Sequence, residues 1–577
     1  MSQEIYDPLA EYANVFQDRF KEVAKTTFDE LAGEAHIDVK ANHETCREIY
    51  NNEGKLSSLK KSINWWIAWC VMTWLIFIGS AILAYYFYTE HEITKTIIFI
   101  VLGILAVIYA TTFMRKRIKK LKSEKEGLMS IIDNLKSIAW KQMEPLNRLY
   151  DWDILTRMMT KTVPRLEFDP YFTTQRLADL QTVYKWDNSF NAERSVIYSQ
   201  SGLINGNPFV LCRTRKMEMG EKTYTGSKTI HWTENERDAN GKVRTVRRSE
   251  VLTASVTAPY PEYFEKTRLI YGNTAAPDLT FNRKQNGLAG KENSLSFKWN
   301  KYKLQRKARN LEDSDFAMMT NEEFEVAFNT SNRNNNQQFA LLFTPLAQEN
   351  MMRLLEDEEV GYGDSFDFDK NKMINVITAV HMQELNLDMN PKQYQQFDFD
   401  KAKECFYTVN ANYFKAIYFA LAPLLCVPMY QQLRPQHEIY GREMEKQSAF
   451  WEHEALANFY GQEHFKHPDC VTDCILKTEQ VKNTDGSLTI DVHAYGYRVE
   501  KRLTHVPKFG GDGRMHNVPV HWDEYFPVTG QGKFRMKEDN TDIDTQVTQT
   551  ERIEHINQVL KADGMKIYRR HIALEGV

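Results

Sequence analysis

The chain has 577 residues, enough for about three or four domains of ordinary size. Apolar residues make up 42% of it and charged residues 26%, which is typical of a globular protein and excludes wholesale disorder or a collagen-like fibre. The formal net charge of −4 disfavours a general nucleic-acid binder, because such proteins carry an excess of cations. The mean hydropathy of −0.53 excludes a transporter with many membrane spans.

Two charge-free runs predict a membrane hairpin. The runs cover residues 65–87 and 96–114, which contain no acidic or basic side chain. At about 1.5 Å per residue, a helix of either length crosses a hydrocarbon core of about 30 Å. Residues 88–95 leave room only for a tight connection, so the two helices are expected to be antiparallel. A buried helical pair inside a globular domain is the alternative, and the basic flanks disfavour it.

The basic residues around these runs predict the topology. Lys55, Lys60 and Lys61 precede the first run, whereas the connecting loop carries only Lys95. Seven bases follow the second run: Arg115, Lys116, Arg117, Lys119, Lys120, Lys122 and Lys125. Because basic residues stay on the cytoplasmic side, we expect a two-span protein of the cell membrane with both termini cytoplasmic. The first residues lack the basic start and the apolar core of a signal peptide.

The flanking segments are expected to be helical and to form a stalk. Residues 1–62 are polar with one apolar stripe, and residues from 118 to about 159 repeat apolar side chains at helical spacing. Two helices that leave the same membrane face should pack together. From about residue 171 the pattern changes to strands, and an antiparallel sheet is predicted over roughly 190–280. Asn240-Gly241 provides a hairpin turn within it.

A basic segment with aromatic residues, 295–312, is open to three interpretations. It could be a solvated surface helix or strand, a segment that docks on the inner membrane surface, or a nucleic-acid contact. The first is favoured, and the last lacks any supporting fold signature. A second apolar stretch, residues 416–430, contains two prolines and is too short to span comfortably, so a buried helix is preferred over a third span.

These patterns predict an α+β fold, with an N-terminal helical stalk and a two-helix transmembrane hairpin before mixed α/β cytoplasmic domains rich in antiparallel sheet. The expected divisions are a cytoplasmic helical segment (1–62), the hairpin (63–114), a helical stalk (115–170), an antiparallel β-rich domain (171–312), an α/β domain (313–435) and a His-rich C-terminal α/β domain (436–577).

The chain resembles a family of uncharacterised bacterial two-pass membrane proteins. The resemblance is strongest over 318–380, where NEEFEVAFNTSNRNNNQQFALLFTPLAQENMMRLL is similar to that family's phenylalanine-bearing helix, linker and following helix. SQSGLINGNPF, FWEHEALANFYGQEHFKHPDC and GGDGRMHNVPVHWDEYF also resemble segments of such proteins. The resemblance implies a bacterial origin and membrane anchoring. The family has no assigned activity, so no catalytic residue is implied.

Common catalytic motifs are missing from the sequence. There is no phosphate-binding G-x4-G-K-[ST] loop, no G-x-S-x-G nucleophile turn and no H-E-x-x-H zinc helix. Asp367, Asp369 and Asn371 imitate the start of a calcium loop. Lys372 stands at the glycine position and Thr378 at the glutamate position of that loop, so a β-hairpin is the better prediction.

One candidate metal site remains. His464, His467, Cys470 and Cys474 are spaced by 3, 3 and 4 residues and could surround a structural Zn²⁺. Pro468 and the tight spacing count against it, and ordinary surface histidines with buried cysteines are the favoured alternative. The seven cysteines are odd in number and mostly scattered, which indicates reduced cytosolic thiols rather than a disulfide framework.

The predicted function is that of a membrane-anchored interaction or scaffold protein. The expected partners are the lipid bilayer and proteins at the cytoplasmic membrane face; nucleic acid is not expected, the oligomeric state is left open, and no cofactor is expected apart from the possible zinc. The alternative is a membrane-tethered, metal-dependent enzyme with its site in the C-terminal domain. Its candidate residues are Glu452, Glu454, His464 and Asp512, although their spacing does not require a catalytic site.

Overall fold

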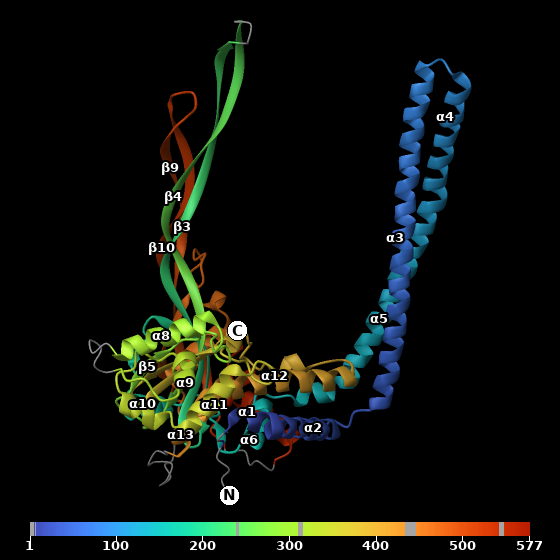
Figure 1. The fold of residues 1–577 in the computed structure, drawn as a ribbon. Coiled ribbons are helices and arrows are strands. Elements are labelled where there is room, and N and C mark those ends of the chain that lie inside the picture. The colour runs from blue at the N-terminus through green and yellow to red at the C-terminus, as the bar shows by residue number, and fades with distance from the viewer. Residues whose placement is uncertain are drawn as a thin grey trace. The chain divides into compact units, whose positions relative to one another are not determined.

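The computed structural model describes Ile5 and residues 7–237, 242–309, 316–432, 446–541 and 547–576. The chain divides into two compact units (Figure 1). Unit 1 comprises residues 1–24, 152–390 and 410–577, and unit 2 comprises residues 25–151 and 391–409. The fold is α+β, with long N-terminal helices and antiparallel sheets, as the sequence predicts.

Unit 2 is dominated by a helical hairpin. Helix α3 (Val39–Thr89) begins at Asp38, whose carboxylate accepts a hydrogen bond from the amide of Ala41. After a three-residue connection follow α4 (Ile93–Ile108), the π-helical turn η2 (Tyr109–Met114) and α5 (Arg115–Leu149). The end of the predicted cytoplasmic helical segment 1–62 and the predicted first span are therefore parts of one continuous helix. Among the described residues, two helices are long and apolar enough to cross a membrane: Val39–Thr89 and Ile93–Leu149.

The N-terminal part of α3 packs against the C-terminal part of α5, which agrees with the packing predicted for the two helices that flank the spans. Cys46 and Ile49 of α3 and Ala139 of α5 form a small buried cluster. Polar contacts flank it, since Gln142 donates a hydrogen bond to the hydroxyl of Thr45 at 3.1 Å. Residues 391–409 close this end of unit 2, where the side chain of Asn42 donates to a backbone carbonyl of that segment.

Unit 1 contains two antiparallel sheets. The first has seven strands in the order β1-β2-β3-β4-β7-β6-β5, and the second has five in the order β11-β12-β10-β9-β8. The strands of the first are β1 (Leu166–Phe168), β2 (Arg194–Ile204), β3 (Asn207–Arg237), β4 (Val243–Gly272), β5 (Thr280–Arg283), β6 (Phe366–Asn371) and β7 (Ile374–Ala379). Those of the second are β8 (Ile475–Lys482), β9 (Leu488–Phe509), β10 (Met515–Glu538), β11 (Ile567–Arg569) and β12 (Ile572–Leu574). The first sheet thus takes strands from both sides of the division expected at residue 312.

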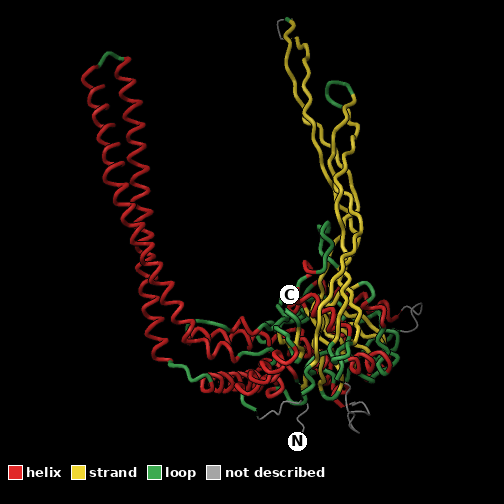
Figure 2. Tube along the Cα trace, turned by 180° about the vertical axis from the view of Figure 1, so that it is seen from behind, coloured by secondary structure: helices red, strands yellow, loops and turns green. Residues whose placement is uncertain are grey.

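Two hairpins of these sheets are unusually long. Strands β3 and β4 pair continuously from Phe209↔Tyr271 to Arg237↔Val243, and β9 and β10 pair from Leu488↔Met536 to Phe509↔Met515. Figure 2 shows both hairpins running together beyond the compact part of unit 1. We call residues 217–237, 243–263, 499–509 and 515–525 the β arm. The predicted Asn240-Gly241 turn lies outside the described residues.

Helices cover the sheets of unit 1. They are α1 (Pro8–Glu11), α2 (Gln17–Glu34, shared with unit 2), α6 (Ile154–Thr162), α7 (Thr174–Thr182), α8 (Leu295–Arg309), α9 (Glu322–Phe328), α10 (Asn336–Leu342), α11 (Pro345–Glu356), α12 (Phe399–Leu425, also shared), α13 (Pro428–Gln432), α15 (Phe450–Tyr460) and α16 (Gln549–Asp563). Residues 416–427 are buried, so the prediction of a buried helix there is confirmed.

Helix α15 ends at Tyr460, because Gly461 adopts a positive φ of 98° and breaks the helical backbone. The hairpin preferred over a calcium loop is confirmed, with Lys372 at a φ of 57° in its turn.

Candidate functional site

The predicted metal residues lie in and before the loop that leads from α15 into β8. The Sγ atoms of Cys470 and Cys474 are 3.6 Å apart and both residues are buried. His464 is exposed, and the Nδ1 atom of His467 accepts a hydrogen bond from the amide of Asp469. Within the described ranges, no group of three or more His, Cys, Asp or Glu side chains is placed to hold a metal ion. The loop thus brings together two of the four predicted ligands.

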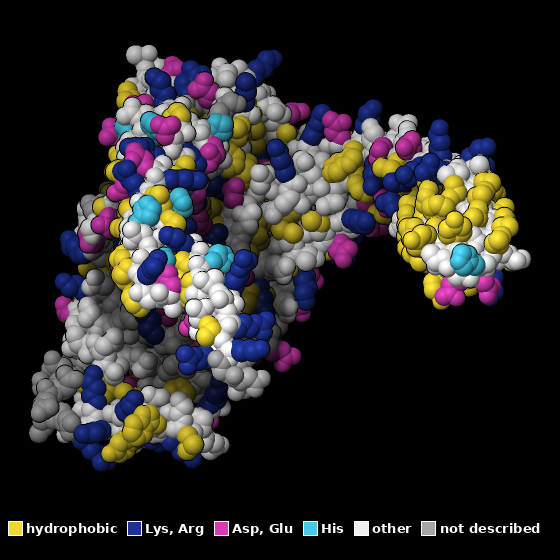
Figure 3. Space-filling view, turned by 90° about the horizontal axis from the view of Figure 1, so that it is seen from above, with side chains coloured by type: hydrophobic (Ala, Val, Ile, Leu, Met, Phe, Trp, Pro, Cys, Tyr) yellow, Lys and Arg dark blue, Asp and Glu magenta, His cyan; other side chains and the backbone are white. Residues whose placement is uncertain are grey.

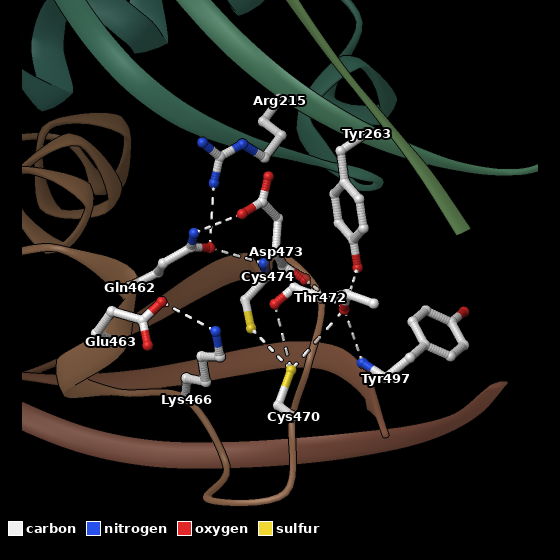
Figure 4. Close-up of polar contacts among 10 residues, drawn as sticks. All are labelled: Arg215, Tyr263, Gln462, Glu463, Lys466, Cys470, Thr472, Asp473, Cys474 and Tyr497. Carbon is white, nitrogen blue, oxygen red and sulfur yellow. Dashed lines mark hydrogen bonds and ion pairs between the residues drawn. The ribbon is translucent and has the colours of Figure 1, made fainter. Parts of the chain in front are cut away.

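Figure 4 shows how this loop is held. The hydroxyl of Thr472 accepts a hydrogen bond from the amide of Tyr497 in β9 and lies 3.1 Å from the hydroxyl of Tyr263 in β4. On the other side, the carbonyl oxygen of the Gln462 side chain accepts hydrogen bonds from the amide of Cys474 and from Arg215 in β3. The loop therefore joins the two long hairpins near the base of the β arm.

The two thiols have the properties of core residues. Burial, together with the nearby Cys470, raises the pKa of the Cys474 thiol to about 12. A protonated thiol is a poor nucleophile. Gly496 lies opposite the pair, and a Cβ atom there would come within 2.5 Å of the Cys470 sulfur. Glycine at this position lets the thiols pack directly on β9.

The enzymatic candidates do not share one set of contacts. Glu452 and Glu454 are both buried in α15, whereas Asp512 lies in the loop at the end of the β9–β10 hairpin and contacts His516 at 2.9 Å. His464 is exposed on a separate 3-10 turn.

Glu452 is the centre of a buried polar network that the sequence did not reveal. Its carboxylate accepts hydrogen bonds from the hydroxyl of Ser199 at 2.9 Å and from the guanidinium of Arg570 at 2.7 Å. Arg570 and His571 form the turn between β11 and β12, with positive φ angles of 44° and 59°. Such angles cost energy in residues other than glycine, so the contacts of the buried arginine help to hold this turn. In the sequence, this network was indicated only by Arg569 and Arg570, two adjacent basic residues in an apolar segment.

A small cavity lies beside Arg570. Its volume of about 30 Å³ is enough for one or two water molecules but not for an organic substrate in this state. Its wall is formed by Trp152, Leu155, Thr156, Phe168, Tyr198, Gln200, Leu211, Leu387, Asp388, Met389, Tyr413, Ile417 and Arg570. The network around Glu452 is therefore a structural element of the core as it stands.

Burial shifts the pKa values of both Glu454 and His453 toward their neutral forms. Burial raises the pKa of Glu454 to about 7, although its carboxylate is 3.0 Å from the ammonium of Lys477. Burial also lowers the pKa of His453 to about 4. His453 contacts the hydroxyl of Ser448 at 2.9 Å, and Ser448 in turn hydrogen-bonds to Glu538. Both Ser448 and His453 are almost fully buried, so no substrate reaches this serine in this structure.

The β arm has a thin apolar interior and a polar exterior. One buried cluster in it, Ile230, Leu252, Ala254, Val518 and Val520, draws on both hairpins. At Gly226 the two hairpins approach so closely that a Cβ atom would lie 2.0 Å from the carbonyl oxygen of Pro519. The middle of the opposite face of the β3–β4 ribbon is exposed and uncharged, and consists of Thr223, Thr225, Ser227, Thr229, Val251, Thr253, Ser255 and Thr257. The sequence predicted strands here but not a free-standing arm.

The basic segment predicted at 295–312 forms the surface helix α8; residues 310–312 lie outside the described ranges. Phe297 and Leu304 are buried against the core, whereas Trp299 and Tyr302 are more than half exposed. The exposed side also carries Lys298, Lys303, Arg306 and Arg309. This agrees with the surface-helix interpretation and leaves membrane docking as a proposal.

Comparisons with known proteins find no match. No protein-family model, no curated protein and no solved structure matches the chain. Functional inference therefore depends on the residues and their arrangement.

Proposed function

We propose that this protein is anchored in the cell membrane by α3 and α4 and acts as an interaction scaffold, with the mass of unit 1 on the cytoplasmic side. The observation that carries the proposal is the exposure of apolar side chains on these helices. In the most apolar windows of the two candidate spans, only 17% and 12% of residues are buried. Figure 3 shows apolar side chains gathered over this helical pair.

The free-energy cost of exposing apolar surface disfavours water as the surroundings of these helices. Leu75, Ile82 and Leu105 are 57%, 63% and 60% exposed, and many neighbours are similar. Exposing apolar surface to water costs about 25 cal/mol per Å². Transfer of a continuous apolar helix surface out of water is therefore favourable. A core helix of a soluble protein would bury these side chains. A bilayer satisfies both the apolar exterior and the helical backbone.

The scaffold part of the proposal rests on the β arm. With 31 residues in β3 at about 3.3 Å per residue, this strand alone extends roughly 100 Å. Beyond the residues that pair with β2 and β7, the outer edges of the β3–β4 ribbon have no strand neighbour in the described sheets. Open edges and an uncharged face are suitable for strand addition or for contact with another protein.

Topology is the first experiment. Reporter fusions to full-length protein, one after Val577 and one between Glu90 and Glu92, distinguish the two sides of the membrane. We expect activity of an extracytoplasmic reporter only at the loop position, because the basic residues follow the second span. Activity of that reporter after Val577 would contradict the cytoplasmic assignment.

The interaction role is tested separately in native membranes. A photo-crosslinking residue placed at Thr225 or Thr253 of the β arm should capture a discrete protein, whereas the same residue at the exposed Glu479 of β8 should not. Equal labelling at all three positions, or no capture from the arm, would remove the arm from the proposal.

A further inference from the structure

A shallow groove, largely open to its surroundings, lies at the C-terminal end of the second apolar helix. It has a volume of about 430 Å³ and is lined by Thr112, Phe113, Lys116, Arg117 and Lys120. Thr112, Lys116 and Lys120 are four residues apart, and Phe113 and Arg117 follow the first two directly, so the five residues share one helical face at the end of η2 and the start of α5. The groove therefore begins in the apolar run and ends in the basic segment.

Its three cations are not neutralised by the protein. Lys116, Arg117 and Lys120 are exposed, and in the part of the chain that the structure describes no carboxylate lies within ion-pair distance of them. Elsewhere in unit 2 lysines do find acids, as Lys95 does with Glu92 and Lys136 with Glu53. Three unpaired cations on one face are complementary to an anion.

The apolar end of the groove is ordered by aromatic contacts. The ring of Phe113 stacks on that of Tyr109 with centroids 5.5 Å apart and contacts the edge of Trp66 in α3 at 6.2 Å. Aromatic side chains of this kind are typical of the headgroup region of a bilayer. The π-helical turn Tyr109–Met114 lies at the same level, and such turns are frequent at functional sites.

We propose that this groove binds the phosphate-bearing headgroup of an anionic phospholipid in the cytoplasmic leaflet. The inference rests on the proposed membrane anchoring and goes beyond it by assigning a defined lipid site. The planar guanidinium of Arg117 forms paired hydrogen bonds to phosphate oxygens, while Lys116 and Lys120 supply positive charge. The acyl chains follow the apolar face above Phe113. A soluble anion would gain the charge contacts but not this apolar continuation.

The test uses full-length protein in detergent, titrated with phosphatidylglycerol or phosphatidylcholine and analysed by native mass spectrometry. The groove variant replaces Lys116, Arg117 and Lys120 by glutamine. The control variant replaces Arg115, Lys119 and Lys122 by glutamine. These residues are also exposed, and their replacement removes the same charge from another face of the same helix. We expect one tightly bound phosphatidylglycerol, a loss of affinity of at least about tenfold in the groove variant, and a loss below about threefold in the control.

The following outcomes support or overturn the proposed lipid site. Equal losses in both variants would show diffuse attraction by the basic segment and overturn the site. Displacement of the lipid by inorganic phosphate would show a site for soluble anions instead. Retained binding in Lys116→Arg/Lys120→Arg would support charge recognition, and lost binding there would contradict it. Alkaline extraction of membranes separates the two proposals: protein that is integrated but shows no lipid selectivity overturns only this inference, whereas extracted protein overturns the anchoring.

Discussion

The apolar helices and the β arm are both long, exposed structures, but they direct their apolar side chains in opposite ways. Helix α3 is 51 residues long and directs many apolar side chains outward, whereas the β arm directs them into a seam between two hairpins. A helix satisfies its own backbone hydrogen bonds and can therefore enter lipid, while the open edges of a ribbon need water or a partner. Whether an exposed segment can lie in lipid therefore depends on its backbone hydrogen bonds as well as on the polarity of its side chains.

The largest effect is expected where the apolar exterior of the helices is broken. The double variant Leu75→Arg/Leu105→Arg places a cation on each exposed apolar face. At about 2.5–3.5 kcal/mol for each arginine near the bilayer centre, the combined cost is roughly 6 kcal/mol. We expect the protein to be lost from alkali-washed membranes, measured by immunoblotting. Leu75→Ile/Leu105→Ile is the control, and full integration of the arginine variant would contradict a transmembrane position.

The next effect concerns the pH dependence of stability at Glu454. Its folded pKa of about 7 is higher than the unfolded value of about 4.3, so the folded protein holds the proton more tightly. The stabilisation is fully present below about pH 4 and is lost as the pH rises through about 7, by roughly 3 kcal/mol in total. Glu454→Gln should remove this fall, as seen by comparing denaturant midpoints between pH 4 and 8.

Stability depends on pH in the opposite direction through His453, so its contribution has to be separated from that of Glu454. Its folded pKa of about 4 is below the ordinary value of about 6.5, so its contribution is lost as the pH falls from about 6.5 to 4. The histidine is present in both proteins, and the difference between wild type and Glu454→Gln therefore isolates the carboxyl group. Glu479→Gln, an exposed position in β8, is the control and should leave the profile unchanged. An unaltered profile in Glu454→Gln would contradict the raised pKa.

A smaller effect is expected in the β arm. Gly226→Ala introduces a Cβ atom where the backbone of Pro519 already lies, and overpacking of this kind costs about 1–3 kcal/mol. The hairpins should separate locally, so amides of residues 224–232 and 516–522 should exchange faster with deuterium. Thr225→Ala, one residue away on the exposed face, should not change exchange. Equal protection in both variants would mean that the hairpins do not pack at this point.

The smallest effect is expected at the thiol pair. Cys470→Ser should reduce the free energy of unfolding by about 1 kcal/mol, because a hydroxyl is more costly than a thiol in this packed site. We expect metal analysis to find the same zinc content in this variant and in wild type, since two ligands alone do not form a structural zinc site. Stoichiometric zinc that is lost with Cys470→Ser would instead support the four-residue site predicted from the sequence.

Patterns that depend on neighbours along the chain were predictable. Gly564 ends α16 in the left-handed conformation, which glycine adopts readily after a helix. Thr320 and Asn321 both precede α9, and Asn321 is the one that accepts the hydrogen bond from the amide of Phe324. Both residue types can cap a helix, and only the chain direction into the helix selects one.

The candidate site was less predictable because it depends on side-chain direction and on distant partners. Cys470 and Cys474 meet across a short loop, while His467 receives a local partner two residues away. The network of Glu452 draws on Ser199 and Arg570, which lie 253 and 118 residues away in the sequence. Spacing alone could not reveal these contacts.

The sequence by itself determined the two apolar runs, their basic flanks and the alternation of the strands, because these follow from composition and local periodicity. Tertiary structure alone decided that β3–β4 and β9–β10 pack as one arm, since Gly226 has meaning only opposite Pro519. It also decided that, among the described residues, no carboxylate lies within ion-pair distance of Lys116, Arg117 and Lys120. Periodicity fixes where a side chain lies on its own element, whereas its chemistry depends on which other elements come within contact distance.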